Sequence, residues 1–481
     1  MPISFSKLGQ LGRMGNSLFQ IASMHGIAKE LGTTCVFPQW KYQRYFKYQL
    51  PRLHKRQNLI YEPQFHYSLD WIEDNKDYHG WLQSGKYFTS KEDVKKLFEF
   101  QDTFSSIVRA KHAVKLERPT IAISIRRGDF VGNENYELLP IKYYIGALLK
   151  FDYENYNLLF FSDDMSYCRT HFECLPNAFF IDADPIEQLC LMTMCENHII
   201  SNSTFSWWGA YLSESKRVIR PLYNFSVSYK YKGNDDKDYY CEDWEVFDHA
   251  KFSIDLDASF LIPYKYDHKD RFENLELVKK DLSCFNAEIL IKENDYPKFH
   301  RTKILNDLAK VCTKDILCIY DTDVLIPPMQ IIEAVKRIKN GDDMVYPYDG
   351  RFARVPRKWY QTLLKYLDIG MLSRETFEGM REHDLKSVGG AIFFNKKSYF
   401  EGGGENENFI SYAPEDKEIN ERFTRLGFKI ERVNGVIYHI DHFISLDSYI
   451  HHEDYPNNEK EYHRVKNLTD TELRNEFYGN N

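Results

Sequence analysis

Two short segments of the sequence carry charged residues whose type and spacing suit the binding of phosphate. Arg126 and Arg127 follow an apolar run, and guanidinium groups form paired hydrogen bonds with phosphate oxygens while keeping their charge. Asp321 and Asp323 follow another apolar run, and carboxylates hold divalent cations that also bind phosphate. One chain therefore contains two unlike ways of neutralising a diphosphate, which predicts two catalytic modules.

Arg126 and Arg127 are expected to have different roles. Neighbouring side chains of an extended strand point to opposite faces, so one of Arg126 and Arg127 should meet phosphate while the other holds structure. Asp129 is a candidate base for an acceptor hydroxyl, because a carboxylate beside arginines stays ionised near neutral pH. The alternatives are that Asp129 clamps Arg127, or that the segment is a surface ion pair.

Two further segments of the first half offer donors to an anion. Gly15 and Asn16 end a glycine-rich turn before a predicted helix, with Asn16 as the expected cap. Amide and hydroxyl donors follow a predicted strand at Asn202, Ser203 and Thr204. Taken alone, each segment is equally compatible with an ordinary turn or a capped helix.

The second half contains a candidate metal site. Asp321 and Asp323 flank Thr322, so in an extended chain both carboxylates point to one side, one toward a metal and the other toward a ribose or a water. His439 and His442 follow another apolar run, and imidazole with carboxylate accepts manganese or magnesium. The alternatives are that residues 321–323 form an ordinary turn and that the histidines serve only in packing.

Asp416 is the candidate base of the second half. It lies in the first turn of a predicted helix that begins at Pro414, where the helix dipole keeps a carboxylate ionised and able to accept a proton. The glycine-rich segment 401–405 just before this helix is expected to be flexible and to order over a bound donor.

The elements that must position these residues indicate an α/β protein. Strand-like apolar runs alternate with segments of helical periodicity through the first half, as in a parallel α/β sheet. A polar stretch at 230–238 ends this alternation. We place a domain boundary near residue 248. The predicted strands are 3–8, 34–37, 121–125, 158–161, 199–200, 258–263 and 316–320, and the predicted helices include 272–279 and 328–339.

Composition narrows the class of protein. A chain of 481 residues with 43% hydrophobic residues can bury more than one core. The net charge of −8 gives no support for binding nucleic acid, and no segment reaches the ~18–20 apolar residues of a membrane-spanning helix. Nine scattered cysteines, an odd number, indicate reduced thiols, so a cytoplasmic protein is expected. The oligomeric state stays open.

The first half resembles the α-1,2-fucosyltransferases, glycosyltransferase family 11, in the ordered segments 12–20, 80–88, 126–129, 161–164 and 202–209. The resemblance implies a GT-B-like, Rossmann-like domain at 1–247, GDP-fucose as donor, inversion at the sugar carbon and no required metal. It also implies that Arg126 and Arg127 lie at the donor diphosphate. Ser124 stands where the family usually has histidine, which puts the rate of this module in question.

The second half resembles inverting GT-A glycosyltransferases of the β-galactosyl- and N-acetylgalactosaminyltransferase-like group. The segments that carry the resemblance are 262–264, 271, 301–306, 321–323, 389–394, 415–416 and the region of His439. It implies Asp323 and a histidine on manganese, with Asp416 as the catalytic base. The residues expected at the UDP-sugar are Pro263, Tyr264, Arg271, Asp321 and Gly390.

Together these patterns predict a bifunctional glycosyltransferase that acts on a glycan acceptor. Residues 1–247 are expected to transfer fucose from GDP-fucose in α-1,2 linkage without a metal. Residues 255–481 are expected to transfer a hexose, galactose or a related sugar, from a UDP-sugar in β linkage with manganese or magnesium. Two alternatives remain, namely that only one module is active, or that the chain is a glycan-binding adaptor without catalysis.

Overall fold

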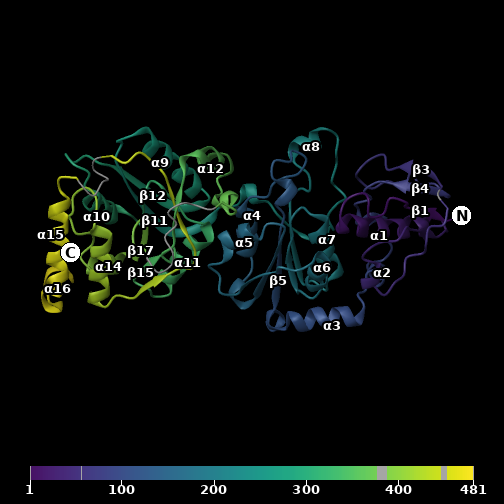
Figure 1. Cartoon of the computed structure of the whole chain (residues 1–481), viewed down its shortest axis with the longest axis horizontal. Helices are drawn as coiled ribbons and strands as arrows, with labels where there is room; N and C mark the ends of the chain where they lie inside the picture. Colours follow the sequence, from purple (N-terminus) through teal and green to yellow (C-terminus); the bar gives the residue numbers. More distant parts are fainter. Residues whose placement is uncertain (1, 56, 376–386, 446–451, 480–481) are drawn as a thin grey trace. The chain divides into compact units, whose positions relative to one another are not determined.

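The computed structural model describes residues 2–55, 57–375, 387–445 and 452–479. The chain forms two compact units. The first contains residues 1–168 and 177–252, and the second contains residues 169–176 and 253–481. Both units are built from helices around largely parallel sheets, which confirms the expected α/β class (Figure 1). The assignment of the units to GT-B and GT-A folds stays a prediction.

The first unit contains two parallel sheets. The smaller has the order β2-β1-β4-β3 and lies beside the long helix α1, whose apolar residues are almost all buried. The larger has the order β10-β9-β8-β5-β6-β7, with β5 buried along its whole length. The strands of the smaller sheet are β1 (Ile3–Ser4), β2 (Cys35–Val36), β3 (Asn58–Tyr61) and β4 (Lys76–His79). Those of the larger are β5 (Thr120–Ile125), β6 (Asn157–Ser162), β7 (Ala178–Phe180), β8 (Asn197–Ile199), β9 (Arg217–Pro221) and β10 (Glu245–Phe247).

The helices of the first half connect these strands, as βαβ crossovers require. They are α1 (Met14–Glu30), α2 (Lys91–Leu97), α3 (Asp102–Lys111), α4 (Ile141–Leu148), α5 (Met165–Phe172), α6 (Pro185–Thr193), α7 (Thr204–Leu212) and α8 (Val227–Tyr231). Two expectations need correction. The predicted strand 3–8 is paired only at Ile3–Ser4, and the N-cap of α1 is Arg13, whereas Asn16 lies inside the helix.

The second unit is built on a mixed six-stranded sheet of order β12-β11-β13-β17-β15-β18. The central strands β11 and β13 run parallel, whereas β17 is antiparallel to β13. A second sheet has the order β14-β19-β16. The strands are β11 (Ile254–Tyr264), β12 (Phe285–Glu293), β13 (Ile316–Tyr320), β14 (Val324–Leu325), β15 (Met344–Tyr346), β16 (Phe352–Val355), β17 (Ala391–Asn395), β18 (Ile430–Arg432) and β19 (Ile437–Ile440).

The helices of the second unit flank these sheets (Figure 1). The strongly amphipathic α11 buries its apolar side chains, such as Ile331 and Val335, at helical spacing. At the end of the chain, Val465, Leu473 and Phe477 pack on Leu426 in a small apolar cluster of their own. The helices are α9 (Lys269–Leu282), α10 (Arg301–Val311), α11 (Pro328–Lys339), α12 (Tyr360–Tyr366), α13 (Lys396–Glu401), α14 (Glu415–Leu426), α15 (Tyr455–Asn467) and α16 (Asp470–Phe477).

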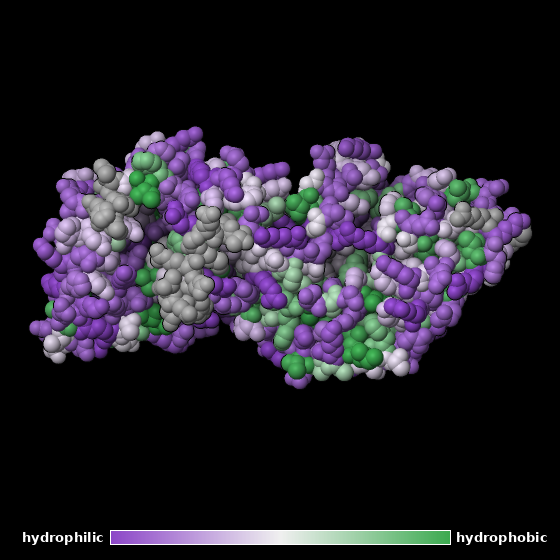
Figure 2. All heavy atoms as spheres, in the orientation of Figure 1, coloured by the Kyte–Doolittle hydropathy of each residue, from purple (hydrophilic) through white to green (hydrophobic). Residues whose placement is uncertain are grey.

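The hydrophilic surface and the burial of most cysteines are typical of a chain that folds around internal cores. The visible face is mostly hydrophilic, with small scattered hydrophobic areas (Figure 2). All nine cysteines are free thiols, and seven of them are buried. Among the described helices, none has the length and apolar character needed to cross a bilayer.

Candidate active sites

Strand pairing builds a cluster of metal-ligating residues in the second unit. The short strand β14 pairs antiparallel with β19, and Val324 lies opposite His439. The backbone N–H of Ile440 donates to the carbonyl of Asp323 at 2.7 Å. Asp323 therefore stands beside His439, and His442 follows β19 closely enough to reach the same carboxylate. Residues more than a hundred positions apart in the sequence thus meet through one strand pair.

The three side chains lie at the spacing of ligands on one cation. His442 Nε2 is 3.0 Å from Asp323 Oδ2 and His439 Nε2 is 3.6 Å from Asp323 Oδ1. Metal-bound nitrogen and oxygen at about 2.1 Å from a cation lie about 3 Å from one another. Nδ1 of His442 lies 2.7 Å from the carbonyl of Phe443 and can donate to it, which leaves Nε2 as the atom facing the carboxylate. The donor set therefore fits a divalent cation.

The charges around Asp323 favour its ionised form. Burial alone would raise the pKa of Asp323, but interactions with the neighbouring His439, His442 and Arg271 hold it well below its usual range. Burial lowers the pKa of His439. Burial also lowers the pKa of His442, but the hydrogen bond to Asp323 and the charge of Asp323 together outweigh it and raise that pKa. Arg271, expected at the nucleotide, contacts Asp323 at 3.2 Å and also Asp267. The Asp323 carboxylate is therefore ionised, as a ligand of a divalent cation must be.

Asp321 belongs to a different group, which corrects the expectation of an extended chain at 321–323 and leaves the separate roles of the two aspartates a prediction. Strand β13 ends at Tyr320 and the chain turns at Thr322 and Asp323, so the argument from an extended chain fails and the two aspartates have different partners. Asp321 Oδ1 accepts from Arg301 Nη2 at 3.1 Å, and the backbone N–H of Asp321 donates to Gly390 at 2.9 Å. Asp321 is absent from the metal-ligating cluster.

Asp416 joins the group around Arg301. Arg301 Nη1 lies 3.4 Å from Asp416 Oδ1 and 3.9 Å from Glu415 Oε1. The helix dipole was expected to keep Asp416 ionised, but burial is the larger effect and raises its pKa to about 7, although Arg301 works in the other direction. A carboxyl that titrates near neutral pH is well matched to general-base work.

The remaining predicted donor residues line the same end of the sheet. Gly389 allows Asp416 to approach, because a Cβ at this position would collide with the carboxylate. Gly390 adopts a φ of +90°, and a Cβ there would lie 2.9 Å from Ile437. Pro263 and Tyr264 end β11, and the buried hydroxyl of Tyr264 has no hydrogen-bond partner among the described residues.

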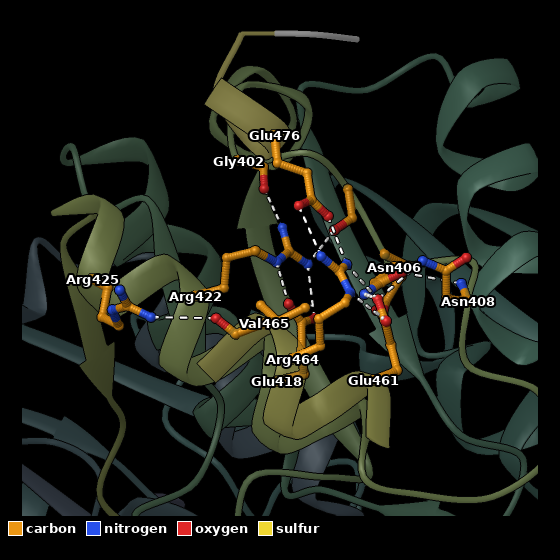
Figure 3. Close-up of polar contacts among 12 residues, drawn as sticks. Gly402, Asn406, Asn408, Glu418, Arg422, Arg425, Glu461, Arg464, Val465 and Glu476 are labelled. Atoms are coloured by element: carbon orange, nitrogen blue, oxygen red, sulfur yellow. Dashed lines mark hydrogen bonds and ion pairs between the residues drawn. The ribbon is translucent and has the colours of Figure 1, made fainter. Parts of the chain in front are cut away.

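The segment 401–405 is not the loose loop that the sequence predicts. The buried guanidinium of Arg422 donates to the carbonyl of Gly402 (Figure 3). It also donates to the carbonyl of Gly404. Glu405 is bonded through its own backbone N–H to Asn306 Oδ1 at 2.9 Å. The segment thus has defined contacts in this structure, and its ordering over a bound donor stays a prediction.

In the first unit, Arg126 and Arg127 have different environments. Arg126 forms ion pairs with Asp129 and, at 2.6 Å, with Asp163. Arg127 is only 3% exposed, its backbone N–H donates to Asp163 at 2.9 Å, and its guanidinium lies 3.9 Å from the centre of the Tyr167 ring. Strands β5 and β6 pair with Ile125 opposite Ser162, which places the arginines beside Asp163.

Asp129 is exposed and does not clamp Arg127. Its carboxylate pairs with Arg126 and, at 3.4 Å, with Arg13 at the start of α1. Arg13 therefore links the arginine segment to the glycine-rich turn. Ser124 is buried within β5.

The starts of α1 and α7 meet in the same unit. The Thr204 hydroxyl donates to Asn16 Oδ1 at 2.8 Å, and a Cβ on Gly15 would lie 2.7 Å from Thr204. Ser203 caps α7 by accepting from the backbone N–H of Phe205. Asn202 is 2% exposed and its amide donates to the carbonyls of Glu137 and Asn224, so its donors hold two loops together.

Sequence reasoning gave no individual role to several charged residues of these sites. Arg301 occupies the first position of α10, where a cation opposes the helix dipole, and that unfavourable placement is a signal of another role. Asp163 directly follows a buried strand, as the arginines do. Arg13 and Glu405 carried no comparable signal, because their partners lie far away in the sequence.

Comparison with known proteins gives a family match for the first half. Residues 11–247 match the model of a family described as glycosyl transferase family 11, which confirms the resemblance expected for this half. The O-antigen biosynthesis glycosyltransferase WbnK of Escherichia coli is 34% identical over 125 residues, or 24% of this chain and 41% of that protein. An alpha-1,2-colitosyltransferase of Escherichia coli is 29% identical over 192 residues, 37% of this chain and 65% of that protein. The chain thus spans less than two thirds of both relatives.

Among solved structures, Drosophila β1,4-galactosyltransferase 7 in complex with manganese, UDP-Gal and xylobiose aligns with 37% of this chain and 65% of its own. The sequence identity is 13% and the TM-score is 0.27, which is too low to assign a fold. The GT-A resemblance of the second half therefore stays a prediction.

Proposed function

We propose that residues 1–247 transfer fucose from GDP-fucose to a glycan hydroxyl in α-1,2 linkage. The observation that carries this proposal is the family match over residues 11–247. One relative is named for α-1,2-colitosyl transfer, so a related GDP-sugar is the alternative donor.

The contacts of this unit suggest how its residues act. Arg126 is held by two carboxylates, and a diphosphate that displaced one of them would gain a guanidinium partner already in position. The joined starts of α1 and α7 offer backbone N–H groups to the same anion. The exposed Asp129 is the candidate that takes the acceptor proton while the bond from the sugar to GDP breaks.

The first test measures transfer from GDP-fucose and from GDP-colitose to galactosides in the presence of EDTA. Arg126→Ala should abolish transfer, whereas Lys216→Ala, which removes an exposed cation paired with Glu196, should not. Failure of the wild-type chain to use either donor with a broad acceptor panel would exclude this function.

We infer that residues 255–481 form a second transferase, which moves a hexose from a UDP-sugar in β linkage with manganese. The observation that carries this inference is the convergence of Asp323, His439 and His442 on one point, with Asp416 in a neighbouring group of the same unit. A site that holds both a cation and a carboxyl of raised pKa suits inverting sugar transfer.

The chain's own residues account for the other requirements of this reaction. Asp323, His439 and His442 would hold the cation, which stabilises the charge on the leaving diphosphate when it is bound. Asp416 accepts the proton of the acceptor hydroxyl. The oxygen of that hydroxyl bonds to the sugar carbon, and UDP departs with the electrons of the bond that breaks. Arg301 orients Asp416 through a 3.4 Å contact.

The second test distinguishes the two modules by whether their activity depends on a metal ion. Asp323→Asn should abolish transfer from UDP-hexoses and leave fucosyl transfer intact. Asp257→Asn is the matched control, because this carboxylate of the same unit is largely exposed and pairs only with surface lysines among the described residues. Hexosyl transfer that persists in EDTA, or in the Asp323 variant, would exclude the metal-dependent mechanism.

A further inference from the structure

A strained turn lies directly before the helix that carries the candidate base of the second unit. Ser411 and Ala413 have φ values of +65° and +50°, in the left-handed region that residues other than glycine seldom adopt. Only five described residues other than glycine have such values, so two of them within three positions mark this turn as unusual. Strain of this kind persists where surrounding contacts hold it, and it gathers at functional sites. We therefore looked for the contacts that hold residues 410–413.

One buried amide contacts this turn at four backbone groups. Asn458 of α15 is 1% exposed, and its side-chain N–H donates to the carbonyl of Ile410 at 2.8 Å. The same amide nitrogen also lies within hydrogen-bond distance of the carbonyls of Tyr412 and Ala413, at 3.3 and 3.1 Å. Its Oδ1 accepts from the backbone N–H of Ile410 at 3.2 Å. Asn458 thus uses both its donor and its acceptor on the turn.

Helix α15 also holds the chain that leads into the turn. Asn458 and Glu461 are three residues apart and therefore lie on one face of the helix. Glu461, which is paired with Arg464, accepts from the amides of Asn406 and Asn408 at 2.8 and 3.0 Å (Figure 3). The same face of α15 therefore contacts the chain at several points between residues 406 and 413.

The opposite side of the turn is bonded to the start of α10. The backbone N–H of Ser411 donates to the carbonyl of Phe299 at 2.8 Å. The hydroxyl of Thr302 donates to the carbonyl of Phe409 at 3.1 Å. Phe299 and Thr302 flank Arg301, the residue whose guanidinium contacts the candidate base. The turn is therefore tied to both sides of that arginine.

The turn also leads directly into α14. Pro414 follows it, and the Pro414 carbonyl accepts from the backbone N–H groups of Lys417 and Glu418 at 3.1 Å. Asp416 lies in this first helical turn, so its place depends on where the chain leaves residue 413. The conformation of residues 410–413 thus bears on Asp416 in two ways, through the start of α14 and through the segment that carries Arg301.

We propose that Asn458 is a positioning residue for hexosyl transfer: by holding the turn 410–413 in its strained conformation, it fixes the start of α14 and with it the orientation of Asp416. This proposal rests on the activity inferred for residues 255–481. It gives a role to α15, all of whose residues are described and lie outside the metal-ligating cluster. It also explains why a polar side chain near the end of the chain is buried against backbone groups.

The first experiment replaces Asn458 by leucine, which has the same branched shape and no hydrogen-bonding group. The kcat of hexosyl transfer should fall by about 10–100-fold, because a misplaced catalytic group loses rate steeply. The KM for the UDP-sugar and the affinity for manganese should stay unchanged, because Asp323, His439 and His442 lie on other elements. Asn457→Leu is the matched control, since this neighbouring asparagine of the same helix is exposed and its variant should keep the wild-type kcat.

A second variant tests the strain itself. Glycine adopts a left-handed φ without a steric penalty, so a turn that has lost its clamp should return to its native conformation more often with glycine at position 413. Ala413→Gly should therefore restore part of the kcat lost in Asn458→Leu. A double variant that is no faster than Asn458→Leu alone would contradict the proposal.

The last experiment does not depend on catalysis. Hydrogen–deuterium exchange of the full chain is followed in peptides that cover residues 408–416. Without Asn458 the backbone N–H of Ile410 loses its acceptor, so exchange in this segment should become about tenfold faster. Exchange equal to that of Asn457→Leu would overturn the proposal. Faster exchange spread evenly over the second unit would also overturn it, because Asn458 would then serve general stability.

The experiments separate the possible failures. A wild-type chain without hexosyl transfer would exclude the proposed activity, while the exchange measurement would still decide whether Asn458 holds the turn. In an active wild-type chain, a kcat of Asn458→Leu equal to that of Asn457→Leu would overturn the positioning role. Fucosyl transfer by the same preparations reports whether the first unit is intact.

Discussion

The sharpest prediction concerns Asp416→Asn. The asparagine side chain has nearly the same shape as aspartate but cannot take a proton from the acceptor. Loss of a general base lowers the rate by about 10²–10⁴-fold, so kcat for hexosyl transfer should fall within this range. Binding of the UDP-sugar should change little, because Asp416 lies with Arg301 and outside the metal-ligating cluster.

The pH dependence follows from burial of the same carboxyl. Its pKa rises from 3.8 to about 7, so the wild-type rate should halve near pH 7 and fall about tenfold for each unit below it. An ordinary carboxyl would leave the rate flat from pH 5 to pH 8. The raised pKa also means that the folded protein holds a proton that the unfolded chain has lost, so the variant gains stability over the wild type as pH rises from about 4 to about 7.

The assay is steady-state transfer from a UDP-hexose with manganese at pH 5 to 9, run beside fucosyl transfer as an internal control. Thermal unfolding over the same pH series checks the linkage. An Asp416→Asn variant that keeps more than about a tenth of the wild-type rate, or a wild-type profile that is flat below pH 7, would refute the assignment of the base.

Three other predictions follow from the sites. EDTA should abolish hexosyl transfer and spare fucosyl transfer, because Asp323 acts through a cation whereas Arg126 carries its own charge; equal loss of both would contradict this division. Asp323→Asn and Arg126→Ala should each silence a different activity, measured with the two donors on one preparation. Gly390→Ala should lower the free energy of unfolding by about 1–3 kcal/mol, because the residue has a φ of +90° and a Cβ would press on Ile437. Gly427→Ala, at a φ of +88° in open space, should cost less in the same denaturation experiment.

The local elements of the fold could be read from the sequence because apolar periodicity reports burial directly. The predictions for β13 and α11 agree with the structure at both ends. The predicted strand 3–8 was too long, because pairing with β2 and β4 stops at Ser4 although Phe5, Ser6 and Leu8 are also buried.

The sites were harder to predict because their geometry depends on distant partners. His439 and His442 were recognised by their chemistry, yet only the pairing of β14 with β19 brings them to Asp323. The glycine-rich segment before Glu405 was taken for a flexible loop, because the sequence does not reveal that Arg422 will be buried against it. Composition indicates the intrinsic flexibility of a segment, whereas tertiary contacts decide whether the segment is held in one conformation.

The pairing of β14 with β19 would also link binding of the proposed cation to the folding of the second unit. The ligands come from two strands separated by more than a hundred residues, so the unfolded chain does not present them together. A cation that binds only the folded form would stabilise it by RT ln(1 + [L]/Kd), about 2.7 kcal/mol at a hundred times Kd. The concentration of free metal would then set the fraction of this unit that is folded as well as the fraction that is active.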